Sequence, residues 1–304
     1  MTSLRKETKY ANYKVIVVDN GSTDNSTRWV EENLPWVDVV ALDKNYGFSI
    51  GNNKGIAYAL KKFNPEYILL LNNDTEIVQE NWLRKLITVA ESEETIGIVG
   101  CKLIYPDGRT QYIGTKLAVT GLSWLKPRDH PKLPETYTVD AVLGACFLIK
   151  RSVIDEIGGL DTGFSPFSDE ESDFCMRAKK AGYKICMVST VKVVHLGGAS
   201  IGKFNSEYVR LIVRSNSIRF MLLNFPASWL AKRVPYEARI FVRCFMARNK
   251  TAKRRIPLKL RDSKDMVIEV KTNVRGWLYN LKNLREIAAK RKNRVMKLPL
   301  IRQK

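Results

Sequence analysis

The sequence has few of the residues that build metal centres and disulfide frameworks. Its 304 residues include two histidines, His130 and His195, and five cysteines. The cysteines form no CxxC pair and no metal-ligand spacing, and most have apolar neighbours, as in the segment GACF at residues 144–147. These features exclude a zinc finger and a disulfide-rich secreted fold. We expect reduced, buried thiols in a cytosolic protein.

Long apolar runs are also lacking. No run reaches the roughly 18–20 residues that span a bilayer, and the first residues do not have the pattern of a signal peptide. Hydrophobic residues nevertheless make up 45% of the chain, which is enough for a globular core. We therefore expect a cytoplasmic protein that is soluble or bound peripherally at the inner face of the membrane.

Acidic residues are scarce in the last third of the chain. Residues 1–200 contain 24 Lys and Arg and 25 Asp and Glu, whereas residues 201–304 contain 27 Lys and Arg and 6 Asp and Glu. The net charge of the whole chain is +20. This asymmetry predicts an anionic partner for the extension: a membrane surface, nucleic acid or a polyphosphate. The near-neutral first two-thirds and the lack of a recognisable nucleic-acid motif favour the membrane surface over nucleic acid.

Short apolar segments alternate with helical patterns through the first two hundred residues. This alternation predicts βαβ units and a parallel sheet, so the expected fold class is α/β. The predicted strands lie at residues 15–18, 37–42, 67–71, 97–101, 184–188 and 192–194, and the predicted helices at residues 25–33, 52–62, 79–91, 152–157 and 171–181. Residues 105–137 contain four prolines and are less regular. Residues 208–224 predict a basic amphipathic helix, and residues 226–247 continue in the same style.

Acidic and amide side chains follow two of the predicted strands. Asp19 ends the first strand, and Asn72, Asn73 and Asp74 follow the strand at 67–71. In open α/β sheets ligands bind where strands end. One aspartate can anchor a divalent cation whose other ligands come from a diphosphate and water, and Asp19 can accept hydrogen bonds from a nucleobase or a ribose. Each cluster alone also fits a capped turn, because Asp and Asn are common there.

Three further segments carry candidate chemistry. The glycines of NYGFSIGNNKG at residues 45–55 allow a ligand to approach the backbone and a following helix N-terminus. Four acids in residues 169–173 raise one another's pKa and could tune a general base, although they also suit a solvated helix start. His195 ends the last predicted strand, where it is either structural or a ligand beside a carboxylate-bound metal.

The motifs described above occur in an order that resembles a known protein family. VIVVDNGSTD, NYGFSIGNNKG, ILLLNNDTEI, GACFLIKRSVIDEIGGLD, DEESDFCMRAKKAGY and VVHLGGAS occur in this order, and together they resemble the family 2 glycosyltransferases, in particular their rhamnosyltransferase-like branch. The resemblance covers roughly residues 1–220. It implies a GT-A fold at residues 1–204, with a Rossmann-like, mostly parallel sheet and helices on both faces. A basic amphipathic helical extension with membrane-surface contact would occupy residues 205–304.

The resemblance also implies a nucleotide-sugar donor and the residues that bind it. Asp19 would hold the nucleobase. Asn45 belongs to the glycine-rich donor segment, and Asn53 matches the family asparagine near the ribose and phosphates. Asn72 and Asn73 stand in the position of the family DXD motif, with asparagine replacing its first acid. Because this replacement lowers the local charge, the identity of the donor sugar stays open.

The metal and the base follow from the same resemblance. Asp74 and His195 would bind Mg²⁺ or Mn²⁺, and Glu171 would be the catalytic base, with Glu170 as the alternative. The implied reaction is an inverting transfer to a glycan or polyprenyl-linked glycan acceptor. The family opens with a strand of the VSIIIPTYN type, whereas this chain opens with MTSLRKETKYANYK, so we expect the first strand to be lacking. A non-catalytic nucleotide-binding relative and a nucleic-acid-binding protein are the alternative functions.

Overall fold

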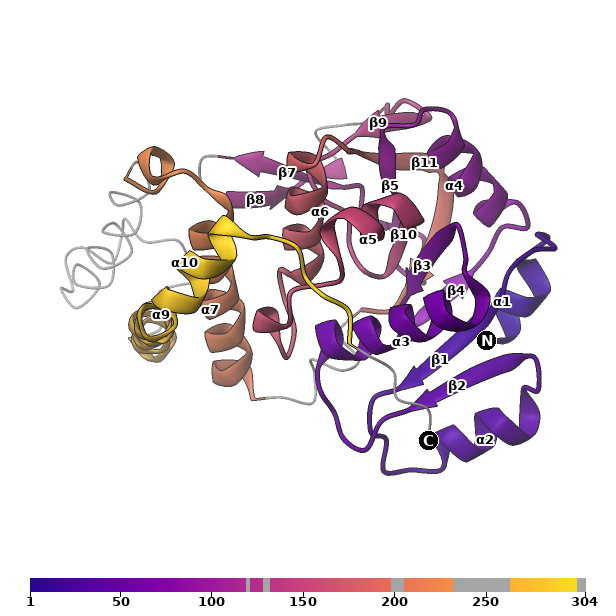
Figure 1. The fold of residues 1–304 in the computed structure, drawn as a ribbon, viewed down its shortest axis with the longest axis horizontal. Coiled ribbons are helices and arrows are strands. Elements are labelled where there is room, and N and C mark those ends of the chain that lie inside the picture. Colours follow the sequence, from indigo (N-terminus) through magenta and orange to yellow (C-terminus); the bar gives the residue numbers. More distant parts are fainter. Residues whose placement is uncertain (119–120, 128–131, 198–204, 232–262, 300–304) are drawn as a thin grey trace. The chain divides into compact units, whose positions relative to one another are not determined.

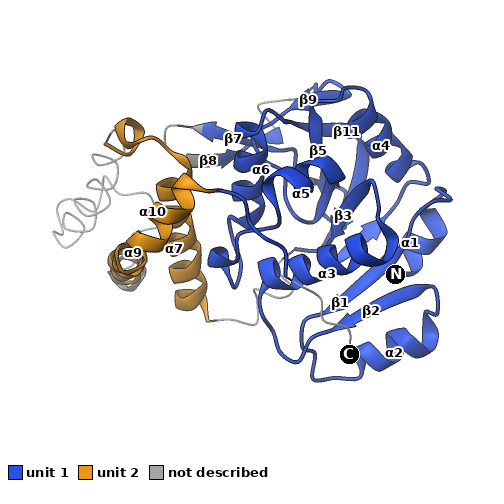
Figure 2. Cartoon of the chain, in the orientation of Figure 1, with its two compact units in different colours: residues 1–117, 122–199, 294–304 blue, residues 118–121, 200–293 orange. Residues whose placement is uncertain are grey.

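The protein is described by a computed structural model, which covers residues 1–118, 121–127, 132–197, 205–231 and 263–299. The chain falls into two compact units (Figure 2). Unit 1 contains residues 1–117, 122–199 and 294–304, and unit 2 contains residues 118–121 and 200–293. The predicted boundary at residue 204 lies outside the described residues. Residues 294–304 group with unit 1 and not with the extension that precedes them.

Unit 1 has the predicted α/β class, with helices interleaved between strands (Figure 1). Its helical elements are α1 (Thr2–Glu7), α2 (Ser26–Asn33), α3 (Phe48–Phe63), α4 (Trp82–Glu91), α5 (Arg151–Ile157), the 3₁₀ turn η2 (Thr162–Phe164) and α6 (Glu170–Lys180). Its strands begin with β1 (Val15–Asp19), β2 (Val37–Ala41), β3 (Tyr67–Leu71), β4 (Thr75–Ile77) and β5 (Ile96–Ile104). The later strands are β6 (Thr110–Tyr112), β7 (Thr115–Ala118), β8 (Gly121–Trp124), β9 (Thr136–Thr138), β10 (Cys146–Lys150) and β11 (Lys184–His195).

The main sheet is mixed, whereas a mostly parallel sheet is expected from the sequence. Its strands lie in the order β3-β10-β5-β11-β4, with β6 paired to β5 and β9 paired to β11. Only the β5–β11 ladder of this sheet is parallel; the other ladders are antiparallel. The apolar sequence of β10 (Cys146–Lys150) is typical of a buried strand, but it carries no information about strand direction. β10 therefore enters between β3 and β5 in the reverse sense.

The first two strands form a sheet of their own. β1 and β2 pair in parallel, with Val15 opposite Val37 and Asp19 opposite Ala41. Every residue of β1 is half-buried, although its apolar sequence alone is typical of a fully buried strand. Within the described residues β1 has a strand neighbour on one edge only, so its other edge lacks the cover that a central strand receives. Helix α3 packs against β1, with Gly55 directly over Val18.

The core of unit 1 is apolar and continuous. Leu86 of α4, Phe147 of β10 and Val193 of β11 are fully buried in it. The indole of Trp82 is 1% exposed and donates to the hydroxyl of Thr8 at 3.1 Å, which fixes the start of α4 on the N-terminal segment. Four thiols are buried and free, as predicted: Cys101, Cys146, Cys175 and Cys186.

Unit 2 is built from helices in its described part. These are α7 (Ser206–Asn224), which confirms the helix predicted at 208–224, α9 (Ser263–Lys282) and α10 (Leu284–Lys292). The guanidinium of Arg219 on α7 is buried and pairs with Glu286 of α10 at 2.7 Å. The predicted continuation at 226–247 lies largely outside the described residues. Among the helices that are described, none is both long enough and apolar enough to cross a bilayer.

Candidate active site

Asp74 and His195 come from two different strand ends and lie side by side. Antiparallel pairing of β4 with β11 places His195 opposite Thr75, and the amide of Leu196 donates to the carbonyl of Asp74 at 3.0 Å. The distance between His195 Nε2 and Asp74 Oδ1 is 3.3 Å, and each side chain is 13% exposed. The sheet register thus brings together the two residues that the resemblance pairs as metal ligands.

Gln111 on β6 orients the imidazole of His195, a role that no motif or periodicity indicates. Its Nε2 donates to the backbone carbonyl of His195 at 3.2 Å, which fixes the orientation of the amide. Its Oε1 then faces His195 Nδ1 at 2.8 Å and accepts a hydrogen bond from the N–H at that nitrogen. In neutral imidazole the lone pair is therefore on Nε2, the nitrogen that faces Asp74.

This arrangement fits a divalent cation. A carboxylate oxygen and an imidazole lone pair face each other at 3.3 Å, and two acceptors at that distance favour a cation near both of them. The carboxamide behind Nδ1 is the kind of partner that orients metal-binding histidines. No group of three or more His, Cys, Asp or Glu side chains in the described part of the chain could hold a metal. Further ligands would come from a bound diphosphate and water.

The acidic helix α6 is linked to the turn before Asp74 through residues 144–145. Glu171 Oε1 accepts from the amide of Gly144 at 3.0 Å, and the carbonyl of Ala145 accepts from the amide of Asn72 at 3.3 Å. There is no room for a side chain at residue 144, because a Cβ there would lie 2.5 Å from Glu171 Oε1. One short turn therefore sets the position of Glu171 relative to the DXD-like segment.

The three successive acids at the start of α6 have raised pKa values. Burial raises the pKa of Glu171, although backbone hydrogen bonds, including the one from Gly144, lower it. Burial and the neighbouring Glu171 hold the pKa of Glu170 well above its usual range. Glu170 is 2% exposed, and its Oε2 has no hydrogen-bond partner among the described residues. The half-buried Glu171 is therefore the better placed of the two predicted candidates to meet a substrate.

Asp169 is a third acid of this cluster, to which the sequence assigned no role of its own. Ser168 and Asp169 both have left-handed backbone conformations, with φ of 86° and 70°. Such strain in consecutive non-glycine residues is concentrated at functional sites. Burial, followed by repulsion from Glu171, raises the pKa of Asp169 to about 7.

Asp169 is expected to make stability fall as pH rises. Its folded-state pKa of about 7 lies above the ordinary 3.8, so the folded chain holds more protons than the unfolded chain between these values, and the free energy of unfolding falls from about pH 4 to pH 7. Asp169→Asn should therefore raise the melting temperature by a few degrees at pH 8 and change it little at pH 4. Glu31→Gln, at an exposed acid of α2, is the control for scanning calorimetry at both values. Equal shifts at the two pH values would contradict this account.

The glycine-rich segment after β2 contacts the loop that leads to the acidic cluster. Asn20 Nδ2 donates to Asn45 Oδ1 at 3.2 Å and to the carbonyl of Gly47 at 3.0 Å. The amide of Phe48 donates to the carbonyl of Pro166 at 2.9 Å. Gly47 has a φ of 82°, and a Cβ on it would lie 2.8 Å from Pro166. Asn45 is thus held in a segment that contacts the loop leading to Asp169.

The other predicted donor-binding residues have different surroundings. The carboxylate of Asp19 accepts hydrogen bonds from Ser22 and Thr27, which leave its pKa lowered even though burial raises it. Asn53 is 2% exposed, and its side-chain amide forms two 2.8 Å hydrogen bonds with the backbone of Leu160. Asn73 is exposed. Asp19 and Asn53 therefore have clear structural roles, and their contacts to a donor stay predictions.

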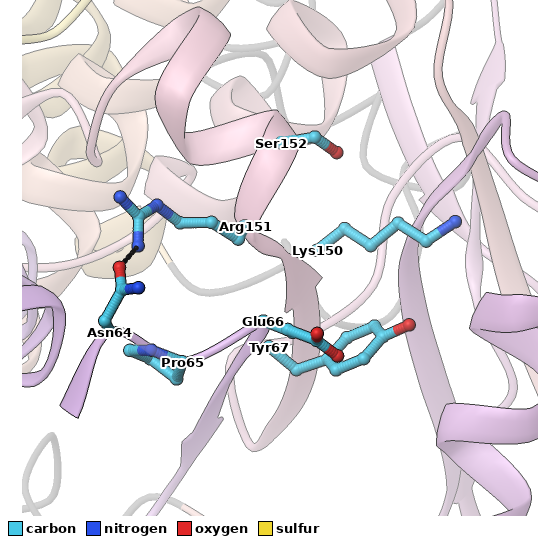
Figure 3. A pocket seen from close by; sticks show the side chains of 7 residues that line it. All are labelled: Asn64, Pro65, Glu66, Tyr67, Lys150, Arg151 and Ser152. Atoms are coloured by element: carbon cyan, nitrogen blue, oxygen red, sulfur yellow. Dashed lines mark hydrogen bonds between the residues drawn. The ribbon is translucent and has the colours of Figure 1, made fainter.

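A cavity of about 360 Å³ lies elsewhere in unit 1 (Figure 3). It is lined by residues at the start of β3 and the end of β10, including Tyr67, Lys150 and Arg151. The guanidinium of Arg151 is engaged by Asn64 at 2.9 Å, and the ammonium of Lys150 by the carbonyl of Glu93 at 3.1 Å. Asp74 follows the opposite end of β3, roughly 16 Å away for a five-residue strand. The candidate active site is therefore separate from this cavity.

Comparison with known proteins gives relatives along most of the chain. The family described as "Glycosyl transferase family 2" matches residues 1–158. The O-antigen biosynthesis protein RfbC of Myxococcus xanthus is 30% identical over 65% of this chain, which spans only 16% of that protein. The low-salt glycan biosynthesis hexosyltransferase Agl10 of Haloferax volcanii is 31% identical, with 73% of this chain and 70% of that protein covered. The N-acetylglucosaminyl-diphospho-decaprenol L-rhamnosyltransferase of Mycobacterium tuberculosis is 24% identical over 62% of this chain and 68% of that protein.

Two solved transferases share the fold. GalNAc-T7, solved with UDP, GalNAc and Mn²⁺, is 18% identical with a TM-score of 0.57 and covers 98% of this chain and 54% of its own. The mannosyltransferase PcManGT of Pyrobaculum calidifontis, solved with GDP-Man and Mn²⁺, is 16% identical with a TM-score of 0.53. The match covers 90% of this chain and 82% of the mannosyltransferase. The GT-A fold implied by the sequence is confirmed. With the family match over more than half of its length, this chain belongs to the family 2 glycosyltransferases.

Proposed function

We propose that this chain is an inverting, metal-dependent glycosyltransferase that uses a nucleotide-sugar donor. The observation that carries the proposal is the close approach of Asp74 and His195, whose imidazole presents Nε2 as an acceptor. The donor class is supported by the fold shared with enzymes solved with UDP or GDP-Man. A glycan or polyprenyl-linked glycan acceptor is supported by the relative named for a decaprenol-linked sugar.

Asp74 and His195 would hold Mg²⁺ or Mn²⁺, and Gln111 would keep the histidine in the ligating tautomer. When bound, the cation would stabilise the negative charge of the leaving diphosphate. The exposed Asn73 and the neighbouring Asn72 are placed next to this ligand pair in sequence, where their amides can donate to phosphate oxygens. Asp19, Asn45 and Asn53 would shape the donor pocket through the backbone segments that they hold.

Glu171 is the proposed general base. Its carboxylate would take the proton from an acceptor hydroxyl while that oxygen attacks the anomeric carbon from the side opposite the diphosphate. A single displacement of this kind inverts the anomeric configuration. The raised pKa of Glu171 makes the carboxylate a stronger base than an exposed glutamate. Burial and the neighbouring Glu171 hold the pKa of Glu170 well above its usual range, which favours its protonated form and makes it the weaker candidate for a base.

The donor class is tested by thermal shift with UDP-, GDP-, dTDP- and CMP-linked sugars, each with and without Mn²⁺. A metal-dependent shift with one nucleotide would support the proposal and name the donor class. Donor binding without transfer to any glycan acceptor would instead favour a non-catalytic nucleotide-binding relative. Salt-sensitive binding to RNA with no response to any donor would favour the nucleic-acid-binding alternative.

The described surface of α9 supports peripheral attachment to an anionic membrane at the cytoplasmic face. Its buried side is polar and faces α7, with Gly276 beside Ile218. Its outer side is apolar, and cations flank the apolar stripe. Val274, Leu278 and Leu281 are exposed at spacings of four and three, with the exposed Tyr279 beside them. The exposed cations are Lys271 and Arg275, which both pair with Glu207 of α7, and Lys282. An outward apolar stripe with flanking cations is suited to a lipid interface.

Leu278→Glu should weaken binding to anionic vesicles about tenfold or more, because it removes a large apolar side chain from the interface and adds a like charge. Co-sedimentation with phosphatidylcholine vesicles, with and without phosphatidylglycerol, measures the effect. Val213→Glu is the matched control, since Val213 is an exposed apolar residue of α7 outside the stripe. Equal binding of the wild type to both vesicle types, or equal losses in both variants, would rule out this surface.

A further inference from the structure

A short segment after α10 leaves unit 2 and packs on unit 1. We call residues 294–298 the C-terminal strap. The amide of Met296 donates to the carbonyl of Ile157 at 3.0 Å, and the amide of Gly159 donates to the carbonyl of Met296 at 2.7 Å. These bonds form a parallel bridge between Met296 and Gly158. The strap is thus attached by backbone hydrogen bonds to the loop that follows α5.

The two glycines of that loop make the attachment possible. Gly158 has a φ of 73°, and a Cβ on it would lie 1.9 Å from the carbonyl oxygen of Met296. A Cβ on Gly159 would lie 2.7 Å from the side chain of Leu298 and 2.4 Å from Oδ1 of Asn53. A side chain at either position would displace the strap. The sequence Gly158-Gly159 therefore fits a loop that is covered by the strap on one side and held by α3 on the other.

Arg294 of the strap brings a positive charge to two buried acids. Its Nη2 donates to Asp173 Oδ1, and its Nη1 lies 3.6 Å from Asp161 Oδ2. Both aspartates are fully buried, and Arg294 is 14% exposed. Arg177 supplies a second guanidinium, with Nε donating to Asp173 Oδ2 at 3.0 Å. The two carboxylates and two guanidiniums of this cluster thus balance in charge. Removal of one charged partner from a buried cluster strongly destabilises the fold, because it leaves a buried charge uncompensated.

This cluster joins the strap to the helix that carries the proposed base. Asp173 and Arg177 both lie on α6, and Asp173 follows Glu171 by two residues. Arg177 also donates to the carbonyls of Ile157 at 2.8 Å and Gly159 at 2.7 Å. The first turn of α6 and the strap are therefore fixed to the same loop and to the same carboxylate. Displacement of Arg294 would leave a net negative charge beneath the turn that positions Glu171.

We propose that Arg294 is a positioning residue for the glycosyl transfer, acting on Glu171 through Asp173 and the first turn of α6. This inference rests on the proposed function for its effect on turnover. The strap lies near the C-terminal end of the sequence but contacts α6 in unit 1. It stabilises the orientation of α6 in which Glu171 is hydrogen-bonded to Gly144. Its contribution is to the chemical step more than to donor binding, since Asp74, His195 and Asn45 are held by contacts outside the strap and its loop.

Steady-state kinetics of Arg294→Ala and Arg294→Lys test this role, with Lys297→Ala as the matched control. Lys297 is an exposed cation of the same strap, so its removal deletes the same charge without touching the cluster. Arg294→Ala should lower kcat about tenfold or more with a donor KM within about threefold of wild type, and Arg294→Lys should recover part of the loss. Lys297→Ala should match wild type. Equal kcat in wild type and Arg294→Ala, or equal losses in Arg294→Ala and Lys297→Ala, would overturn the proposal.

A double variant that balances the charge of the cluster tests the same coupling if Arg294→Ala alone folds poorly. Asp173→Asn with Arg294→Ala restores neutrality of the cluster, so its kcat should exceed the value expected from the two single changes combined. Additive losses would contradict the proposed coupling.

Hydrogen exchange separates this inference from the proposed function. Amides of residues 170–173 should exchange at least about tenfold faster in Arg294→Ala than in wild type or Lys297→Ala, whereas amides of β3 should not change. If the wild-type protein proved inactive, the proposed function would fail. The hydrogen-exchange rates would still show whether Arg294 stabilises the first turn of α6. Unchanged exchange at residues 170–173 would overturn it.

Discussion

Glu171→Gln is expected to lower kcat about 10²–10⁴-fold while donor affinity stays near the wild-type value. The amide keeps the size of the side chain and still offers an oxygen to the amide of Gly144, which Glu171 Oε1 meets at 3.0 Å. It cannot take a proton from an acceptor hydroxyl, so only the chemical step should be lost. Transfer measured with a saturating donor, together with donor binding by calorimetry, separates the two effects.

Glu170→Gln is the matched variant for this prediction. Glu170 is the adjacent acid, but it is 2% exposed and its pKa is held well above its usual range by burial and by Glu171. Because burial favours the uncharged form of Glu170 and glutamine is also uncharged, activity should change by less than about tenfold. Full activity of Glu171→Gln together with an inactive Glu170→Gln would transfer the role of base to Glu170.

Asp74→Ala is expected to abolish the dependence of donor binding on metal. Asp74 supplies the anionic member of a two-residue ligand set, and alanine would leave His195 as the single protein ligand of that pair. A loss of donor affinity of about 10²-fold or more in the presence of Mn²⁺ should follow, with little change in its absence. Titration of the donor at several Mn²⁺ concentrations measures both quantities.

Glu76→Ala is the control for Asp74→Ala, because Glu76 is an exposed acid only two residues further along the chain. Its Mn²⁺ dependence should equal that of wild type. Gln111→Leu should give an intermediate result, with metal affinity reduced about 10–100-fold through loss of the partner that orients His195. A Mn²⁺ dependence of Asp74→Ala that matched wild type would remove Asp74 from the metal site.

Sequence patterns place Asp74 shortly after one strongly apolar strand and His195 at the end of another, whereas their pairing as metal ligands is implied by the family resemblance. Buried strands are recognised by their short apolar runs, and the polar residues after them then lie at a sheet edge. Gln111 could not be found in the same way. It lies on β6, a three-residue strand in the proline-containing stretch where the sequence predicted little regular structure, and its importance comes from a side-chain contact 84 residues away.

The C-terminal strap could not be predicted from the sequence for a related reason. Arg294 lies among many cations in the last third of the chain, and composition alone assigned all of them to one basic surface. Its contact with Asp173 spans 121 residues, a separation over which periodicity and local motifs carry no information. The burial of Asp161 and Asp173 was equally invisible, because aspartate is usually exposed. The three-dimensional structure shows that one of these cations lies in unit 1 beside two buried aspartates.

The discontinuity of unit 1 has a consequence for the order of biosynthesis. Unit 2 separates residue 199 from residue 294, so a ribosome that has finished most of the catalytic half must still translate about ninety residues before the strap exists. At about 5–20 residues per second, this takes about 5–20 s. During that interval the nascent chain has Asp161 and Asp173 but lacks Arg294. Completion of the catalytic half is thereby tied to synthesis of the basic extension, and a prematurely terminated polypeptide would leave these acids without their second guanidinium.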